Sequence, residues 1–142
     1  MINAIESLSI LRVLVVSVVG FFLGALWFSP LLFVKAWLAE MKWTPEMIAG
    51  LQKEPGSKLL LPKCFVWTAL STFTLASLLA LNHTNEAFKG LELGLFVGVG
   101  LVASRESVNG MFERHTIRHR LITSGHDVAL LALQAAILGV WR

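Results

Sequence analysis

The chain has 142 residues, of which 56% are hydrophobic and 15% are charged, with a net charge of +3 and a mean hydropathy of +0.71. So little polar surface cannot coat a soluble globule of this length, so the composition excludes a soluble protein and indicates an integral membrane protein. The single cysteine, Cys64, excludes an intramolecular disulfide and a thiolate metal cluster within one chain.

The first predicted membrane span contains a run of 22 uncharged residues, 13–34. That length is close to the roughly 20 residues that cross a bilayer core. Pro30 lacks an amide hydrogen and cannot bond the Leu26 carbonyl, so we expect a kink there, with Ser29 or the Trp27 indole near the freed carbonyl. Proline kinks of this kind also serve packing alone, so a functional role for Pro30 is one of two interpretations.

A short helix over about residues 45–53 is predicted in the loop that follows. Thr44 is a typical N-cap, Pro45 suits the first turn and Glu46 suits the positive end of the helix dipole. Its apolar stripe is formed by Met47, Ile48 and Leu51. We interpret the segment as an interfacial helix that rests on headgroups, with a partner-docking helix as the alternative.

The remaining spans are less regular. Residues 64–82 are 19 uncharged residues, whereas the uncharged runs 93–104 and 128–141 have only 12 and 14 and reach spanning length only if they extend through charged residues. The predicted fold is therefore all-α, an integral membrane four-helix bundle forming a single domain over residues 1–142, with spans at about 10–35, 60–82, 90–112 and 121–141.

Lysine and arginine are distributed asymmetrically between the two sides. Nine fall in or beside the first and third loops and three on the other side, which by the positive-inside rule places these loops in the cytoplasm and both termini outside. The positive charge then faces anionic headgroups, and nucleic-acid binding need not be invoked. The nine are Lys35, Lys42, Lys53, Lys58, Lys63, Arg105, Arg114, Arg118 and Arg120, and the three are Arg12, Lys89 and Arg142.

Small residues recur every fourth position in the spans. Gly20 and Gly24 form one such pair, and Gly90, Gly94 and Gly98 repeat the spacing twice. Small residues four apart line one helix face and let two backbones approach closely. We favour packing within one bundle over a dedicated dimer or trimer seam. Four short helices enclose little space, however, so we also expect a homo-oligomer.

Two stretches resemble a known family. They are Gly24-Ala25-Leu26-Trp27-Phe28-Ser29-Pro30-Leu31-Leu32-Phe33-Val34-Lys35-Ala36-Trp37 and, near the C-terminus, Asn109, Phe112-Glu113-Arg114, Leu121-Ile122, Gly125 and Ala136-Ile137-Leu138-Gly139-Val140-Trp141. They are similar to the signature of the bacterial domain of unknown function 1761 family. The resemblance implies a four-helix protein of the bacterial inner membrane and implies no activity. In that membrane, the outside termini expected from the charge asymmetry would be periplasmic. Phe28 and His126 stand where the family commonly has tyrosine, which puts in doubt any mechanism that needs those hydroxyls.

A layer of polar residues is predicted in the cytoplasmic third of the bundle. Arg105 lies roughly 10 Å before the end of its span near Phe112, and Asp127 roughly 9 Å after the start of its span near Leu121, so the two share a level. Charges at membrane depth are costly and usually functional. The predicted members are Ser29, Pro30, Thr68, Ser71, Arg105, Glu106, Asn109, His126 and Asp127.

Within this layer we expect Arg105 to face Asp127 and Glu106 to lie near His126, because buried charges require partners. In another register Arg105 pairs with Glu106 of a neighbouring chain. A heptad face of the third span, Glu92, Val99, Glu106 and Glu113, is expected to point inward or into a subunit interface. The layer is either a structural salt-bridge network or a site for a ligand, a lipid headgroup or a proton.

The third loop combines histidines with arginines. His115 and His119 lie four apart and could share a metal, but the neighbouring arginines would repel a divalent cation, so no metal site is predicted. The alternatives are a solvated basic loop and contact with lipid headgroups or an acidic ligand. The headgroup candidates are Arg114, Arg118 and Arg120.

Three classes of function follow. The favoured one is an oligomeric bundle whose polar layer binds or passes a small solute, an ion or a lipid headgroup. The alternative is a structural or accessory subunit that docks a lipid, a cofactor or a larger membrane complex, with the layer as a buried salt-bridge network. A membrane enzyme is least favoured because no nucleophile has an adjacent base, and no cofactor is predicted.

Overall fold

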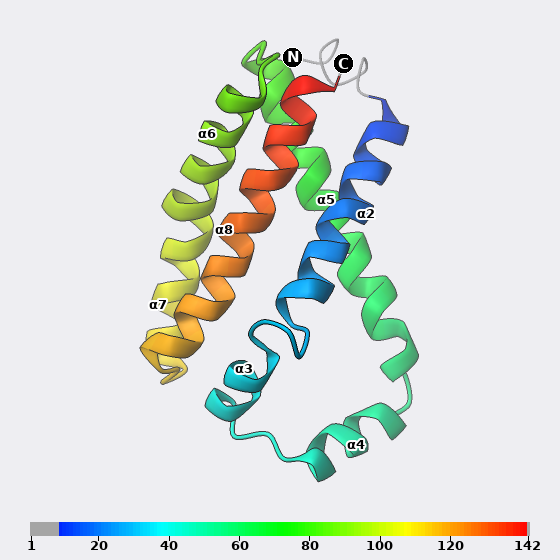
Figure 1. The fold of residues 1–142 in the computed structure, drawn as a ribbon, viewed down its shortest axis with the longest axis vertical. Coiled ribbons are helices and arrows are strands. Elements are labelled where there is room, and N and C mark those ends of the chain that lie inside the picture. The colour runs from blue at the N-terminus through cyan, green and yellow to red at the C-terminus, as the bar shows by residue number, and fades with distance from the viewer. Residues whose placement is uncertain (1–8, 142) are drawn as a thin grey trace.

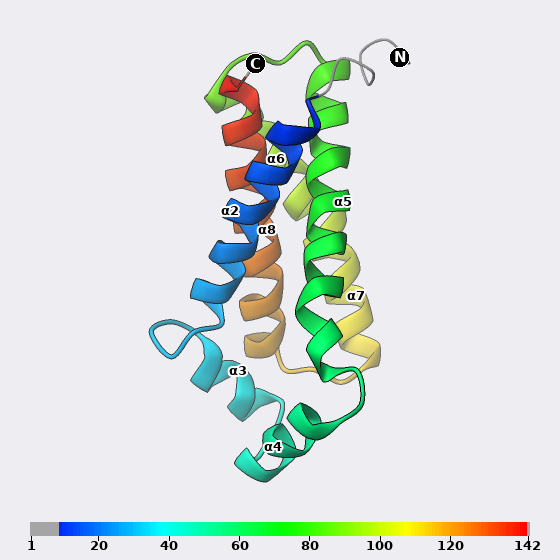
Figure 2. The ribbon, with the colours of Figure 1, turned by 90° about the vertical axis from the view of Figure 1, so that its right-hand side faces the viewer.

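The computed structural model describes residues 9–141, which form helices, turns and loops without a strand. Four segments are long and apolar enough to cross a membrane, and they run alternately up and down (Figures 1 and 2). The predicted all-α membrane bundle is thus confirmed. The segments are α2 (Ile10–Trp27), η1 (Ser57–Leu59) with α5 (Leu60–Leu81), then α6 (Ala87–Val97), the π-helix η2 (Gly98–Ala103) and α7 (Ser104–Phe112) as one span, and α8 (Ile117–Val140).

The first span is shorter than the sequence predicts. Its helix ends at Trp27, and Pro30 lies exposed in the turn that follows, so the expected kink inside a continuous helix is wrong. The Leu26 carbonyl accepts from the Ser29 amide at 3.1 Å, and the Trp27 carbonyl accepts from the Phe33 amide at 3.0 Å. The turn therefore satisfies the carbonyls that the proline would leave free, and the helix stops instead of bending.

Two short helices lie between the first and second spans. α3 (Val34–Glu40) begins after the turn, and α4 (Pro45–Lys53) occupies the residues predicted for the short helix. The Thr44 hydroxyl caps α4 by accepting from the Met47 amide at 3.3 Å, and a hydrogen bond with the same side chain lowers the pKa of Glu46. Figures 1 and 2 show α4 lying across the end of the bundle, which we call the α4 end.

The closest packing is between α6 and α8. A Cβ on Gly90 would overlap the Ala135 carbonyl, and one on Gly94 would lie 2.5 Å from the Leu131 carbonyl oxygen. Such contact is possible only because both positions are glycine. The small-residue face of this span is therefore occupied within the chain, against α8, as the favoured interpretation requires.

The third span keeps one face against α8 by changing its helical pitch. Residues four apart drift by about 40° per step in an α-helix, so a long four-residue stripe would leave the partner helix. The wider π turns of η2 counter this drift. The stripe consists of the buried or half-buried residues Gly90, Gly94, Gly98, Val102, Glu106 and Gly110. The expected heptad face does not point into the bundle, because Glu92, Val99 and Glu113 are exposed, and its alternative, a subunit interface, stays a prediction.

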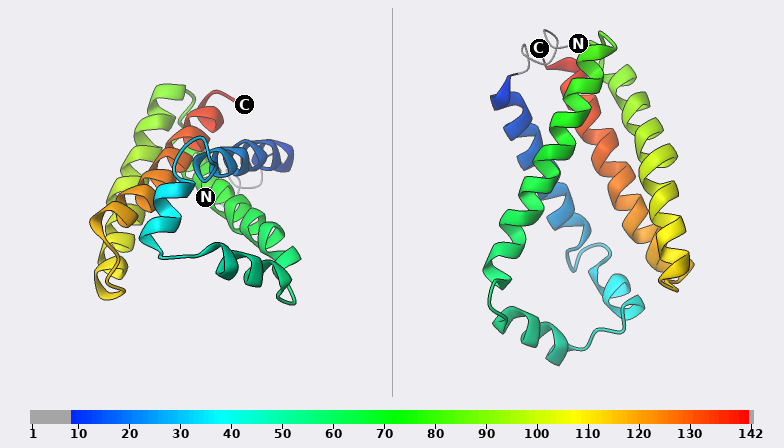
Figure 3. Two further views of the ribbon diagram at one scale, coloured as in Figure 1. Left: turned by 60° about the horizontal axis from the view of Figure 1, so that its bottom comes forward. Right: turned by 180° about the vertical axis from the view of Figure 1, so that it is seen from behind.

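A buried polar group joins α5 to α8 in the middle of the bundle. The side-chain amide of Gln134 donates to the Thr72 hydroxyl at 2.8 Å, and that hydroxyl donates to the Thr68 carbonyl at 2.8 Å. Gln134 and Thr72 are fully buried, and the Gln134 carbonyl oxygen Oε1 has no hydrogen-bond partner. Figure 3 shows that α5 crosses α2, and that α2, α5 and α8 diverge from one another toward the α4 end.

Candidate functional site

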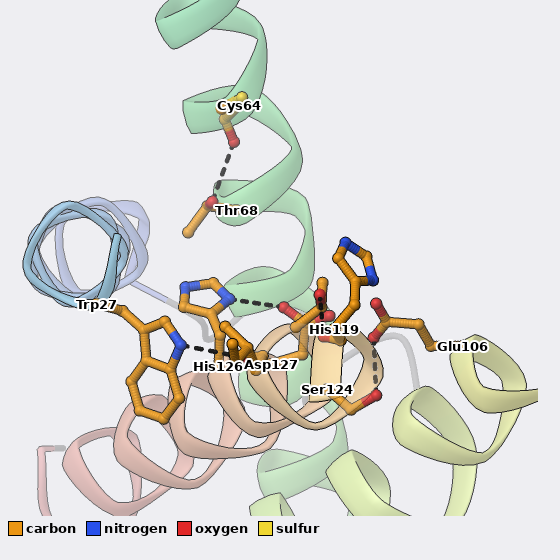
Figure 4. A network of polar contacts seen from close by, with 10 residues as sticks. Trp27, Cys64, Thr68, Glu106, His119, Ser124, His126 and Asp127 are labelled. Carbon is orange, nitrogen blue, oxygen red and sulfur yellow. Dashed lines mark hydrogen bonds and ion pairs between the residues drawn. The ribbon is translucent and has the colours of Figure 1, made fainter. Parts of the chain in front are cut away.

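Three of the predicted layer residues come together where α7 meets α8. His126 Nδ1 lies 2.8 Å from Asp127 Oδ1, and the Ser124 hydroxyl donates to the Glu106 carboxylate at 3.2 Å (Figure 4). The carboxylates of Glu106 and Asp127 also lie close to one another. The site thus has a histidine at one end and two carboxylates behind it.

Other predicted members lie apart from this group. Arg105 and Asn109 are exposed on the outer face of the third span, and Arg105 makes no ion pair with any described residue. The expected pairing of Arg105 with Asp127 is therefore wrong. Glu106 lies near His126 as expected, but the carboxylate bonded to His126 is that of Asp127. Because the stripe keeps Glu106 toward α8, the adjacent Arg105 is rotated by about 100° and points away.

The remaining predicted residues lie on α5 and in the α2–α3 turn. Ser29 accepts a hydrogen bond from the Leu31 amide at 3.2 Å, which stabilises the turn around Pro30. The Thr68 hydroxyl donates to the Cys64 carbonyl at 3.0 Å, within its own helix. Ser71 is half-buried one turn further along α5.

A cavity of about 410 Å³ lies between α2, α5 and α8. It brings Thr68 and His126 to the same space, although α5 and α8 are far apart in the sequence. Small residues of α2 leave this space open, and nearly all of its wall is apolar. Its lining residues are Gly20, Phe21, Gly24, Ala25, Phe28, Leu61, Cys64, Thr68, His126 and Leu130.

His126 is held at the wall of the cavity by aromatic rings. Its ring centroid lies 6.0 Å from that of Trp27 and 5.1 Å from that of Phe28. The Trp27 indole donates to the Ile122 carbonyl at 3.1 Å, which fixes the end of α2 against α8. The second ring nitrogen, Nε2, is buried and has no hydrogen-bond partner. It points toward Gly24, where an added Cβ would lie 3.2 Å away.

Unpartnered polar atoms concentrate on α8. Within residues 9–141, every buried side-chain nitrogen or oxygen that lacks a partner belongs to this helix. The atoms are Nδ1 of His119, Nε of Arg120, Nε2 of His126 and Oε1 of Gln134. An unsatisfied polar group is costly in a membrane, where water is absent. These four atoms of α8 therefore need hydrogen-bond partners that the chain itself does not supply.

At the α4 end, α3 packs against the start of α8 and is bonded to it. The Glu40 carboxylate accepts from the Thr116 hydroxyl and lies 3.7 Å from the Arg118 guanidinium. The Trp37 ring stacks on His119 with centroids 6.3 Å apart. These contacts hold the α2–α3 turn, and with it Phe28, over His126.

The loop arginines and histidines are placed as follows. Arg114 and Arg118 are exposed, whereas Arg120 packs on Gly110 and donates to the Ser107 carbonyl at 3.5 Å. The rings of His115 and His119 lie 4.2 Å apart. Over the described part of the chain, no three His, Cys, Asp or Glu side chains are grouped so that they could hold a metal ion.

Sequence reasoning missed several members of the site. The glycine spacing predicts only a packing role for Gly24, and no pattern in the sequence assigns Cys64 to a site. Ser124 stands one helical turn before Asp127, a spacing that could have identified it. Glu40 has no local signal, because its partners lie 76 and 78 positions away. Only the fold brings these residues together.

The fold and the site define a helical membrane protein with four spans, a lateral apolar cavity and a histidine–carboxylate group at its wall. The chain belongs to the family described as protein of unknown function (DUF1761), whose sequence profile matches residues 11–139. No curated protein and no solved structure matches the chain. The family relation covers all four spans and carries no activity.

Proposed function

We propose that this protein binds a small, mostly apolar molecule from the bilayer in the cavity between α2, α5 and α8. The volume of about 410 Å³ falls within the range of small-molecule sites, which are mainly apolar with a few placed polar groups. The apolar wall favours a lipid-soluble ligand over an ion or a hydrophilic solute, because either of these would lose its hydration without compensation.

One observation carries this proposal. His126 Nε2 is buried at the cavity wall without a partner, while the other ring nitrogen is bonded to Asp127. A purely structural histidine in a membrane would have both nitrogens satisfied. A bound molecule that places a polar group against Nε2 supplies the missing hydrogen bond.

The proposal is tested by filling the cavity. Cys64 is exposed on α5 and lines the cavity, so Cys64→Phe places a ring in it without disturbing buried packing. Leu70→Phe is the matched control, because Leu70 is exposed on the same helix and is not among the residues that line this cavity. Each protein is purified in mild detergent, and the lipid-soluble molecules that remain bound are extracted and quantified by mass spectrometry.

Wild type and Leu70→Phe are expected to retain the same lipid-soluble molecules in similar molar amounts. Cys64→Phe is expected to retain severalfold less of these molecules. Equal amounts in all three proteins, with equal thermal stability, would overturn the binding proposal. That result would instead support a structural or accessory role, the second candidate. The observation that favours this role is that Glu106 is bonded to Ser124 and His126 to Asp127 within the chain.

We also propose a homo-oligomer in the bacterial inner membrane, with the α4 end in the cytoplasm and both termini in the periplasm. The distribution of lysine and arginine supports this orientation. Exposed Arg114 and Arg118 would contact lipid headgroups there. Arg105 and Asn109 are polar groups on the outer face of a span that a second copy would cover. A monomeric mass in lipid nanodiscs would contradict the oligomer.

A further inference from the structure

We propose that the ligand of this cavity must donate a hydrogen bond to His126 Nε2, so that the protein selects lipid-soluble molecules bearing a hydroxyl or a similar donor. This inference rests on the proposed binding function and specifies its ligand. It follows from which hydrogen-bonding groups at the cavity are already used and which remain free.

Asp127 determines which ring nitrogen of His126 carries the proton. An ionised carboxylate only accepts hydrogen bonds, so the nitrogen 2.8 Å from Oδ1, Nδ1, carries a hydrogen and donates it. In the neutral ring the other nitrogen, Nε2, then has a lone pair and accepts. The atom that faces the cavity wall is therefore an acceptor without a donor.

The donors around the cavity are already engaged. The Thr68 hydroxyl donates to the Cys64 carbonyl, and the Trp27 indole donates to the Ile122 carbonyl. The Cys64 thiol is only a weak donor. The wall thus offers a free acceptor at His126 and no free strong donor, so a ligand that only accepts hydrogen bonds finds no strong partner there.

Space for the donor depends on Gly24. Nε2 is covered by its surroundings, and an added Cβ at this position would lie 3.2 Å from it, so the glycine leaves this side of the nitrogen free of a side chain. The rings of Trp27 and Phe28 pack on His126 and prevent it from turning to find another partner. A fixed acceptor at the wall of a cavity is the arrangement that favours a donor on the incoming molecule.

Cys64 provides a built-in reporter for the test. It is the only cysteine of the chain, it is exposed and it lines the cavity, so N-ethylmaleimide labels this position alone. The probes are 4-hexylphenol, 4-hexylanisole and hexylbenzene, compared at equal concentrations in the membrane. The first donates, the second only accepts and the third does neither. Protection of Cys64 from labelling measures occupancy of the cavity.

In the wild-type protein we expect 4-hexylphenol to bind roughly fivefold to tenfold more tightly than the other two probes, the effect of one hydrogen bond to a buried acceptor. His126→Phe retains a ring but removes the acceptor, so the three probes should then bind alike. His115→Phe is the matched control, since His115 does not line the cavity, and it should preserve the preference.

Asp127→Asn gives the more specific test. The asparagine amide can donate to Nδ1, which moves the ring hydrogen to Nε2 and turns the acceptor into a donor. The preference for 4-hexylphenol over 4-hexylanisole should then disappear or reverse. A role of Asp127 in folding alone would weaken all three probes equally.

The outcomes separate the two proposals. If the three probes protect Cys64 equally in the wild type, the cavity binds apolar molecules but the donor requirement is wrong. A preference for 4-hexylphenol that persists in Asp127→Asn also overturns the inference. Failure of 4-hexylphenol to protect Cys64 also overturns the donor requirement. If, in addition, the purified wild type retains no more bound material than Cys64→Phe, the proposed binding function is wrong as well.

Discussion

The two faces of α8 are built in opposite ways. Toward α6 the helix presents Ala132 and Ala135 to Gly90 and Gly94, and the backbones are nearly in contact. Toward α2 it presents His126 to Gly24, and a cavity remains beside them. Glycine occurs on the partner helix in both cases. A glycine opposite a small residue lets two helices close, whereas a glycine opposite a large polar ring leaves room for a ligand.

The two faces of α8 should therefore have different roles, one in stability and the other in ligand binding. The face toward α6 has its packing satisfied by the chain itself. The face toward α2 and α5 contains the unpartnered atoms of His126 and Gln134. Stability should therefore respond most strongly to changes on the first face, and ligand content to changes on the second.

The largest effect on stability is expected from Gly94→Leu. The added side chain would collide with the Leu131 carbonyl, 2.5 Å from the position of its Cβ, and would force α6 away from α8. Overpacking of this kind costs about 3 kcal/mol. Thermal unfolding followed by tryptophan fluorescence in detergent measures it. Gly100→Leu is the control, because nothing lies within 4 Å of that position. Equal unfolding temperatures for the two variants would contradict the proposed role of this face.

A smaller effect is expected on the other face, at Gln134. Gln134→Ala leaves a void and should cost about 2 kcal/mol. Gln134→Leu fills most of the void and removes the unpartnered oxygen Oε1, so it should stay within about 1 kcal/mol of the wild type. The same unfolding measurement applies. A leucine variant as unstable as the alanine variant would mean that the hydrogen bond to Thr72 outweighs the unpartnered oxygen.

The smallest effect on stability is expected from the contacts between α3 and α8. Glu40→Ala removes the contacts with Thr116 and Arg118 and should favour local opening by about 1 kcal/mol, or roughly fivefold. Trypsin cleavage after exposed Lys42 measures that opening. Glu54→Ala serves as the control, since Glu54 is exposed and makes no side-chain contact of this kind. An unchanged cleavage rate in Glu40→Ala would show that the contacts of Glu40 do not hold α3 against α8.

Local signals predicted the helical architecture well. Hydropathy and length identified four spanning segments, and Thr44 followed by Pro45 located the start of α4 because capping depends on neighbouring residues. Glycine spacing likewise identified the face of α6 that meets α8. These features depend on residues a few positions apart, which a sequence displays directly.

The predictions are wrong where the structure depends on contacts between residues that are far apart in the sequence. The Trp27 indole at the end of α2 donates to the Ile122 carbonyl 95 positions away, a contact that no local pattern indicates. Counting residues from the ends of the spans predicts one depth for Arg105 and Asp127, but the direction of Arg105 depends on the π-helix, for which the sequence carries no clear signature. Adjacent residues on a helix do not usually face each other, so the sequence does not predict the contact between His126 and Asp127.

The π-helix Gly98–Ala103 lets the third span hold one residue more than a regular α-helix would without turning α7. Removing one residue from this segment would restore regular α-helical turns, and the roughly 100° lost with the residue would be regained by the tighter turns. Glu106 would then still face Ser124. A deletion in the regular turns of α7 before Glu106 has no such compensation, and it would rotate Glu106 away from α8 by about 100°.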